Sequence, residues 1–138
     1  MKEVITRSEE ETLNLAAEIG RNSSPGDVLC LKGELGAGKT HFVKGFVTAF
    51  GIDSDQVSSP TFSLINEYIG NCSVYHFDCF RLEKPEEALE IGAEEYFYGD
   101  GVCIIEWPDR IASILPGNVK YIEISSINST TRSIRLPD

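Results

Sequence analysis

The segment "GELGAGKT", residues 33–40, constrains the fold of this chain more than any other stretch. It fits the pattern Gly-x-x-x-x-Gly-Lys-Thr, in which glycines let consecutive backbone N–H groups turn toward a phosphate. The apolar run 27–33 before it predicts a buried strand, and the helical spacing of apolar residues in 39–51 predicts a helix after it. A strand, a glycine-rich loop and a helix in this order predict a binding site for a nucleoside triphosphate.

The residue types in the loop match the chemistry of phosphate. The helix expected to begin near Lys39 adds the positive end of its dipole at the loop. Lys39 brings a full positive charge to the outer phosphates, and the Thr40 hydroxyl is a ligand for Mg²⁺. The alternative is a glycine-rich turn with an incidental lysine, and the complete pattern between a strand and a helix argues against it.

The remaining segments predict a mixture of β–α units and antiparallel pieces. Capping and periodicity indicate helices over residues 8–22, 84–97 and 108–115, and strands over 61–69, 73–78, 101–107, 118–127 and 130–136. We therefore expect one α/β domain over residues 1–138, of the P-loop NTPase type. Its mixed central sheet is flanked by helices and ends in an antiparallel C-terminal hairpin.

The net charge of the chain indicates which kinds of partner it can bind. Twelve Lys and Arg residues against 22 Asp and Glu give a net charge of −10, whereas nucleic-acid binding needs a basic patch that displaces counterions. We therefore expect that this chain does not bind RNA or DNA by itself. The acidity either keeps the protein in solution or fits a basic protein partner.

The four cysteines form no C-x-x-C pair and have no zinc-like spacing. The sequence also contains no apolar run of membrane-helix length, and its first residues lack the apolar core of a signal peptide. We expect a cytoplasmic protein with reduced thiols and no membrane association.

Two acidic residues end predicted strands. Asp78 closes "VYHFD" and Glu106 closes "VCIIE". The carboxyl ends of parallel strands meet at the ligand-binding edge of an α/β sheet, and Mg²⁺ prefers oxygen ligands. Glu106 is a candidate either to bind the metal or to orient the attacking water, and Asp78 is a candidate to hold the metal's hydration shell. The sequence does not separate these roles, and a solvated residue after a strand is the alternative for each.

Four further residues attract attention. Thr61, in "SSPTFSL", lies either in a plain loop or in a switch-like segment that senses the terminal phosphate. Trp107 is either a core residue or packs under the nucleotide or a partner. We expect His76 to be a strand residue rather than a base, and His41 to contribute chiefly its backbone N–H at the helix start.

The stretches "GELGAGKT", "SPTF", "YHFDCFR" and "IIEWPDRI", in this order, resemble the TsaE family, small bacterial ATPases required for threonylcarbamoyladenosine formation on tRNA. The resemblance extends from the first helix through Leu115. It implies that ATP and Mg²⁺ are bound, with metal residues at Thr40 and Glu106 and Asp78 close to the metal. The implied nucleotide-binding residues are Gly33, Glu34, Leu35, Gly36, Ala37, Gly38, Lys39, Thr40 and His41.

The resemblance also implies a reaction and partners. Glu106, Asp78 and Thr61 take the catalytic positions, with Thr61 on the switch-like motif and Trp107 on the family's Glu-Trp pair. The implied partners are the tRNA threonylcarbamoyl transferase (TsaD-like) and its TsaB-like companion, and tRNA is reached only through them. The sequence itself places no obvious arginine to stabilise the transition state, although Arg81, soon after Asp78, is a candidate. We therefore expect ATP hydrolysis by the isolated chain to be slow and to be stimulated by this complex.

Three departures from the family pattern affect single positions. His41 stands where a second threonine is common, and Cys79 and Phe80 replace a Leu-Tyr pair, so Phe80 is assigned only packing. The chain ends at Asp138, short for the family, and no adenine-contacting residue is predicted.

Two other function classes use the same loop. A small-molecule kinase needs an acceptor site and a lid carrying arginines, but this chain has six arginines and none of them cluster. A nucleotide-dependent binding switch specific for guanine needs an Asn-Lys-x-Asp type of motif, which the sequence lacks.

Overall fold

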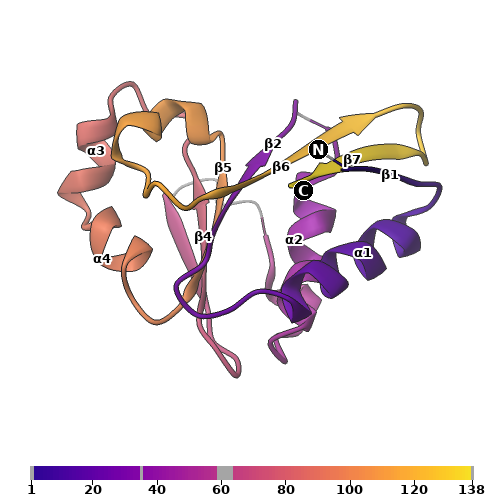
Figure 1. Ribbon diagram of the computed structural model, residues 1–138, viewed down its shortest axis with the longest axis horizontal. Coiled ribbons are helices and arrows are strands. Elements are labelled where there is room, and N and C mark those ends of the chain that lie inside the picture. The colour runs from indigo at the N-terminus through magenta and orange to yellow at the C-terminus, as the bar shows by residue number, and fades with distance from the viewer. Residues whose placement is uncertain (1, 35, 59–63, 138) are drawn as a thin grey trace.

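The computed structural model describes residues 2–34, 36–58 and 64–137. One seven-stranded sheet in the order β1-β7-β6-β2-β5-β4-β3 forms the centre of the molecule (Figure 1). The strands are β1 (Lys2–Thr6), β2 (Val28–Lys32), β3 (Ile65–Tyr68), β4 (Val74–Asp78), β5 (Val102–Glu106), β6 (Lys120–Ser126) and β7 (Arg132–Leu136). The helices are α1 (Glu9–Arg21), α2 (Lys39–Thr48), α3 (Pro85–Glu90) and α4 (Ala93–Phe97), with 3₁₀ turns η1 (Ser54–Gln56) and η2 (Pro108–Ile114).

The middle of the sheet is parallel and its margins are antiparallel. Strand β2 pairs in parallel with both β5 and β6, and β5 pairs in parallel with β4. The β3–β4, β6–β7 and β1–β7 pairs are antiparallel. The predicted mixed sheet flanked by helices and the predicted C-terminal hairpin are therefore confirmed.

Both faces of the sheet are covered by helices. Figure 1 shows α1 and α2 on one side, and α3 and α4 on the other. Side chains alternate along β2 accordingly: Leu29 and Leu31 belong to the core under α1 and α2, whereas Val28 and Cys30 belong to the core under α3, α4 and η2. Because β2 is buried on both faces, it is a continuous apolar run, as parallel central strands usually are.

Helix α1 packs closely across α2. The Ser8 side chain caps α1 by accepting a hydrogen bond from the Glu11 amide at 3.1 Å, as the capping pattern predicts. A Cβ atom added to Gly45 in α2 would lie 2.3 Å from the Leu13 carbonyl oxygen of α1. The absence of a side chain at Gly45 therefore allows the close approach of these two helices.

Several predicted boundaries were wrong or incomplete. The single helix predicted over 84–97 is divided into α3 and α4 by Gly92, whose φ of 82° ends one helix and precedes the next. The helix predicted over 108–115 is the 3₁₀ segment η2. Residues 61–63 of the strand predicted over 61–69 lie outside the described residues, and β3 begins at Ile65.

Strand β1 was missed entirely. Its sequence, KEVIT, is short and mostly polar, and its strand conformation depends on pairing with β7 at the other end of the chain.

All four cysteines are free thiols, and three of them are buried. Within the described part of the chain, no helix is both long and apolar enough to cross a membrane.

Candidate functional site

In the described part of the loop between β2 and α2, two glycines have backbone conformations that suit a phosphate site. Gly36 and Gly38 have φ values of 81° and 102°, a region that residues with a side chain rarely adopt. Gly38 is the N-cap of α2 and no side chain caps this helix. The first α2 backbone bond runs from the Phe42 amide to the Gly38 carbonyl at 3.0 Å. The amides of the first turn therefore have no acceptor within the helix, and they are suited to an anion.

Lys39 is folded back over this loop. Its side chain is only 6% exposed, and Nζ donates a hydrogen bond to the Gly33 carbonyl at 2.7 Å. The same ammonium lies 4.1 Å from the centroid of the Trp107 ring, a cation–π distance. Burial lowers the pKa of Lys39 below its ordinary value, while the Glu106 and Asp78 carboxylates oppose this shift. The negative groups around Lys39 thus help to keep a buried ammonium charged.

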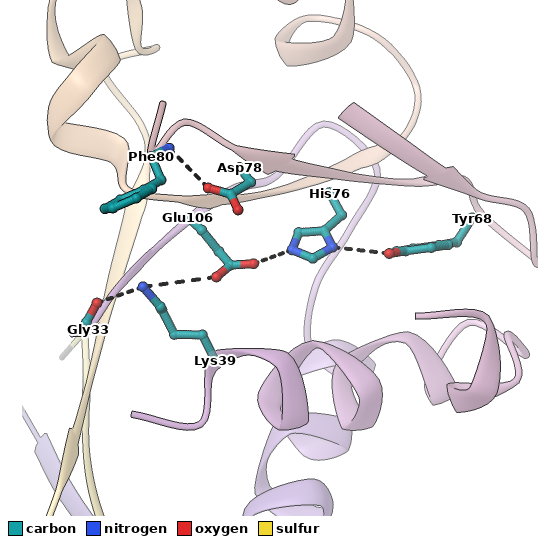
Figure 2. Close-up of polar contacts among 7 residues, drawn as sticks. All are labelled: Gly33, Lys39, Tyr68, His76, Asp78, Phe80 and Glu106. Carbon is teal, nitrogen blue, oxygen red and sulfur yellow. Dashed lines mark hydrogen bonds and ion pairs between the residues drawn. The ribbon is translucent and has the colours of Figure 1, made fainter. Parts of the chain in front are cut away.

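The two predicted acidic residues come together at one edge of the sheet. Asp78 and Glu106 are register partners at the carboxyl ends of β4 and β5. Glu106 is buried, and its Oε1 lies 4.0 Å from Lys39 Nζ. Asp78 is half-buried, and its Oδ1 accepts a hydrogen bond from the Phe80 amide at 3.0 Å. Figure 2 shows the Glu106 carboxylate facing Lys39, with the Asp78 carboxylate on the other side of Glu106 and bonded to Phe80.

His76 contacts Glu106 directly, a contact that the sequence did not predict. Its side chain is fully buried, with Nε2 2.5 Å from Glu106 Oε2 and Nδ1 3.1 Å from the Tyr68 hydroxyl (Figure 2). His76 is a strand residue, as expected, but it belongs to the site. The available signal was the two-residue period of β4, which puts His76 on the same face as Asp78.

Arg132 is a second residue that the sequence did not single out. Its Nε donates to the Ala37 carbonyl at 2.9 Å, within the glycine-rich loop. Its Nη1 donates to the carbonyls of Asn128 and Thr131 at 2.7 and 3.1 Å. Arg132 therefore connects β7 to the loop, a long-range contact for which the sequence held no local signal.

Trp107 and Phe80 form an aromatic pair beside Lys39. Trp107 has a φ of 56°, the only positive φ among the described residues other than glycine. Its ring lies over the Lys39 ammonium, and the Phe80 ring packs against it with centroids 4.9 Å apart. Trp107 therefore covers Lys39 rather than filling the middle of the core, and Phe80 supports it by packing.

The other predicted residues are placed as follows. Thr40 is half-buried in the first turn of α2, and His41 Nε2 lies 3.3 Å from Glu9 Oε1 of α1. Glu34 and Gly36 are exposed on the loop, and Ala37 is buried beneath it. Leu35 and Thr61 lie outside the described residues.

The side-chain oxygens near the loop suit Mg²⁺, which waters and substrate phosphates help to bind, better than a metal ion bound only by protein ligands. Across the described ranges, no group of three or more His, Cys, Asp or Glu side chains could hold a metal ion. Mg²⁺ commonly takes one or two carboxylates and completes its shell with waters and substrate phosphates. Thr40 in the first turn of α2, and Glu106 with Asp78 at the ends of β5 and β4, supply oxygen donors of the kind that this mode of binding uses.

Comparisons with known proteins agree with one another. The family model described as "Threonylcarbamoyl adenosine biosynthesis protein TsaE" matches residues 6–134. The tRNA threonylcarbamoyladenosine biosynthesis protein TsaE of Treponema pallidum is 41% identical over 94% of this chain and 96% of its own length. The protein of the same name from Bacillus subtilis is 43% identical over 94% of this chain and 80% of its own. The crystal structure of Bacillus subtilis YdiB superposes with a TM-score of 0.79 at 36% identity, over 96% of this chain and 82% of that one.

Proposed function

The chain belongs to the TsaE family, and from this membership we propose that it binds ATP with Mg²⁺ and hydrolyses it slowly in support of tRNA threonylcarbamoyladenosine biosynthesis. The observation that carries the proposal is the buried pair formed by Lys39 and Glu106 at the glycine-rich loop. Their charged atoms lie 4.0 Å apart, and both side chains are almost completely buried. Buried charges are costly to keep, so a cation and a carboxylate at a phosphate-binding loop indicate a site for an anionic ligand with its metal.

Each group has a separate task in this proposal. Lys39 leaves the Gly33 carbonyl and the Trp107 ring to bind the outer phosphates, while the loop amides hold the inner ones. Thr40, Glu106 and Asp78 supply oxygen atoms for the metal and its waters. When bound, Mg²⁺ neutralises charge on the phosphates. Glu106 Oε1, on the side facing Lys39, either contacts the metal or orients the attacking water.

We expect slow turnover because the arginine that contacts the loop is already bonded to other groups. Arg132, which reaches the loop, is already bonded to three backbone carbonyls. A phosphate-loop protein turns over at roughly 10⁻⁴ to 10⁻² per second unaided, and a supplied arginine adds about 10³- to 10⁵-fold. We therefore infer that the partner complex, the threonylcarbamoyl transferase and its companion, stimulates ATP hydrolysis by this chain. With a net charge of −10, contact with tRNA through these partners is also the simpler arrangement.

The test is a phosphate-release assay on the isolated chain, with Mg²⁺ or with EDTA, and with or without the purified transferase pair. We expect slow Mg²⁺-dependent release that the pair accelerates and that Lys39→Ala abolishes. Fast turnover that the pair does not change would contradict the proposed dependence on partners. Phosphate release that persists in Lys39→Ala would contradict the assigned site.

A further inference from the structure

A line of polar side chains begins beside Lys39 and crosses three neighbouring strands, away from the glycine-rich loop. Glu106 on β5, His76 on β4 and Tyr68 on β3 contact one another in series (Figure 2). Glu106 is paired in register with Asp78, and Tyr68 with Val74, so His76 lies diagonally from both. Diagonal neighbours on one face of a sheet are within reach of long side chains.

This line is embedded in the core rather than exposed at the surface. The exposed fractions of Glu106, His76 and Tyr68 are 6%, 0% and 4%. Tyr68 belongs to the apolar core under α1 and α2, together with Ile104 and Val74. Among the described residues, no fully buried side-chain nitrogen or oxygen lacks a hydrogen-bond partner. The line is therefore a completely bonded polar network inside an apolar core.

The carboxylate at one end gives the network a direction. An ionised carboxylate only accepts hydrogen bonds, so His76 Nε2, 2.5 Å from Glu106 Oε2, carries a hydrogen and donates it. In a neutral imidazole the other nitrogen is an acceptor, so Nδ1 accepts the hydrogen of the Tyr68 hydroxyl at 3.1 Å.

The two carboxylate oxygens of Glu106 therefore have different partners. His76 engages Oε2, and Oε1 faces Lys39 at the loop. A carboxylate bonded at one oxygen and packed in the core has lost most of its rotational freedom before any ligand binds. Reacting groups held in this way gain rate through orientation.

We propose that Tyr68 and His76 are positioning residues, a hydroxyl–imidazole–carboxylate relay that holds Glu106 with Oε1 presented to the nucleotide. This inference rests on the proposed function of the site. Neither residue touches the reacting atoms. Outer groups that hydrogen-bond to metal ligands act in the same way, and their loss typically costs about 10- to 100-fold in activity or metal affinity.

Three substitutions separate this role from simple filling of the core. Tyr68→Phe deletes one hydroxyl and keeps the ring. His76→Gln retains an N–H donor near the place of Nε2, whereas His76→Leu removes it. Tyr75→Phe is the matched control, because Tyr75 lies on the same strand as His76 but packs in the opposite core, against Tyr96.

Kinetics give the first readout. We expect His76→Leu to lower kcat for ATP about 10- to 100-fold, with nucleotide Kd changed no more than about threefold, and His76→Gln to recover most of the loss. Tyr68→Phe should lower kcat about threefold to tenfold, in the same direction as His76→Leu but by less. A purely structural role would instead lower the melting temperature and leave kcat of the folded fraction unchanged. Wild-type kcat in folded Tyr68→Phe and His76→Leu would overturn the proposal; if His76→Leu does not fold, Tyr68→Phe decides alone.

The second readout needs no turnover. The chain has two histidines, so ¹⁵N spectra of the imidazole rings in nucleotide-free protein can be assigned with His76→Gln. We expect His76 to carry its hydrogen on Nε2, and Tyr68→Phe to weaken this preference while Tyr75→Phe leaves it intact. A hydrogen on Nδ1 would overturn the relay. Should the chain hydrolyse no ATP, the proposed function fails, and the tautomer still decides whether the relay exists.

Discussion

Lys39 Nζ and Glu106 Oε1 are separated by 4.0 Å, which is too far for a hydrogen bond and close enough for a strong electrostatic interaction. Each group is bonded elsewhere: Lys39 to the Gly33 carbonyl, and Glu106 to His76. The two charges therefore face each other without collapsing into a contact pair. This arrangement would leave both groups able to exchange partners with the proposed nucleotide and its metal.

Glu106→Gln should separate turnover from binding. The amide keeps the shape of the side chain and an oxygen for His76 Nε2–H, but it removes the negative charge that faces Lys39. We expect ATP turnover to fall at least about 100-fold, as for the loss of a general base or metal ligand. Nucleotide affinity should change by no more than about threefold, which is under 1 kcal/mol.

Steady-state kinetics with a parallel binding titration measure both quantities. Asp109→Asn is the matched control, since Asp109 is a mostly exposed acid three residues further along the chain. Normal hydrolysis by Glu106→Gln would show that the carboxylate has no part in the reaction.

Arg132→Ala should weaken nucleotide binding by loosening the loop. The guanidinium Nε bonds to the Ala37 carbonyl at 2.9 Å and fastens the loop to β7. A hydrogen bond from a charged group contributes about 1.5–3 kcal/mol, so we expect roughly tenfold weaker ADP binding. Isothermal titration should show this loss, with Arg135→Ala unchanged because Arg135 is largely exposed on the same strand. Equal affinities of the two variants would mean that the Arg132 contact does not support the loop.

Much of the fold could be predicted from local patterns in the sequence. Strand β2 was predicted from its apolar run, α2 from its periodicity, and α1 from Ser8 and Glu11. What failed required information from distant parts of the chain. Strand β1 has no apolar alternation of its own and forms only where β7 is available. Helices α3 and α4 are separated by a single glycine, Gly92, which lies inside a segment of good helix formers.

In the candidate site, too, some residues could be predicted from local patterns, whereas other contacts depend on distant parts of the chain. Lys39 and Thr40 were predicted from a contiguous motif, and Asp78 with Glu106 from strand ends that the sheet then aligned. His76 was placed correctly on β4, but its bond to Glu106 depends on which strands are neighbours. The Arg132 contact depends on the hairpin register near residue 132, which no local pattern specifies.

Gly45→Ala should destabilise the packing of α1 on α2. The new methyl carbon would lie 2.3 Å from the Leu13 carbonyl oxygen, a backbone atom that cannot rotate away. Overpacking costs about 1–3 kcal/mol, and the better helix propensity of alanine recovers only about 1 kcal/mol. We expect a clear loss of unfolding free energy in urea titrations. Gly117→Ala, where a Cβ atom meets nothing within 4 Å, should stay within about 0.5 kcal/mol of the wild type.

The buried thiols should be unreactive and should make stability fall at alkaline pH. Burial raises the pKa of Cys30, Cys79 and Cys103 from 9.0 to about 12. Because the unfolded chain loses these protons at lower pH than the folded one, unfolding free energy should decline between pH 9 and about 12. Urea titrations at several pH values measure the decline, and it should be smaller in a variant with alanine at all three positions.

Alkylation supplies an independent check on the same thiols. At pH 8, native protein should react with iodoacetamide at the half-buried Cys72 well before the three buried positions, and urea should expose all four. Rapid native modification of Cys30, Cys79 or Cys103 would contradict the predicted burial effect.

Isothermal titration of the purified chain with ATP, in Mg²⁺ and in EDTA, tests the assigned nucleotide site most directly. Saturable binding of one ATP per chain, tighter with Mg²⁺ and weakened about 10- to 100-fold by Lys39→Ala, is the predicted result. Lys44→Ala, further along α2, should bind as the wild type does. No heat of binding with folded wild-type protein, or equal affinity in Lys39→Ala, would contradict it.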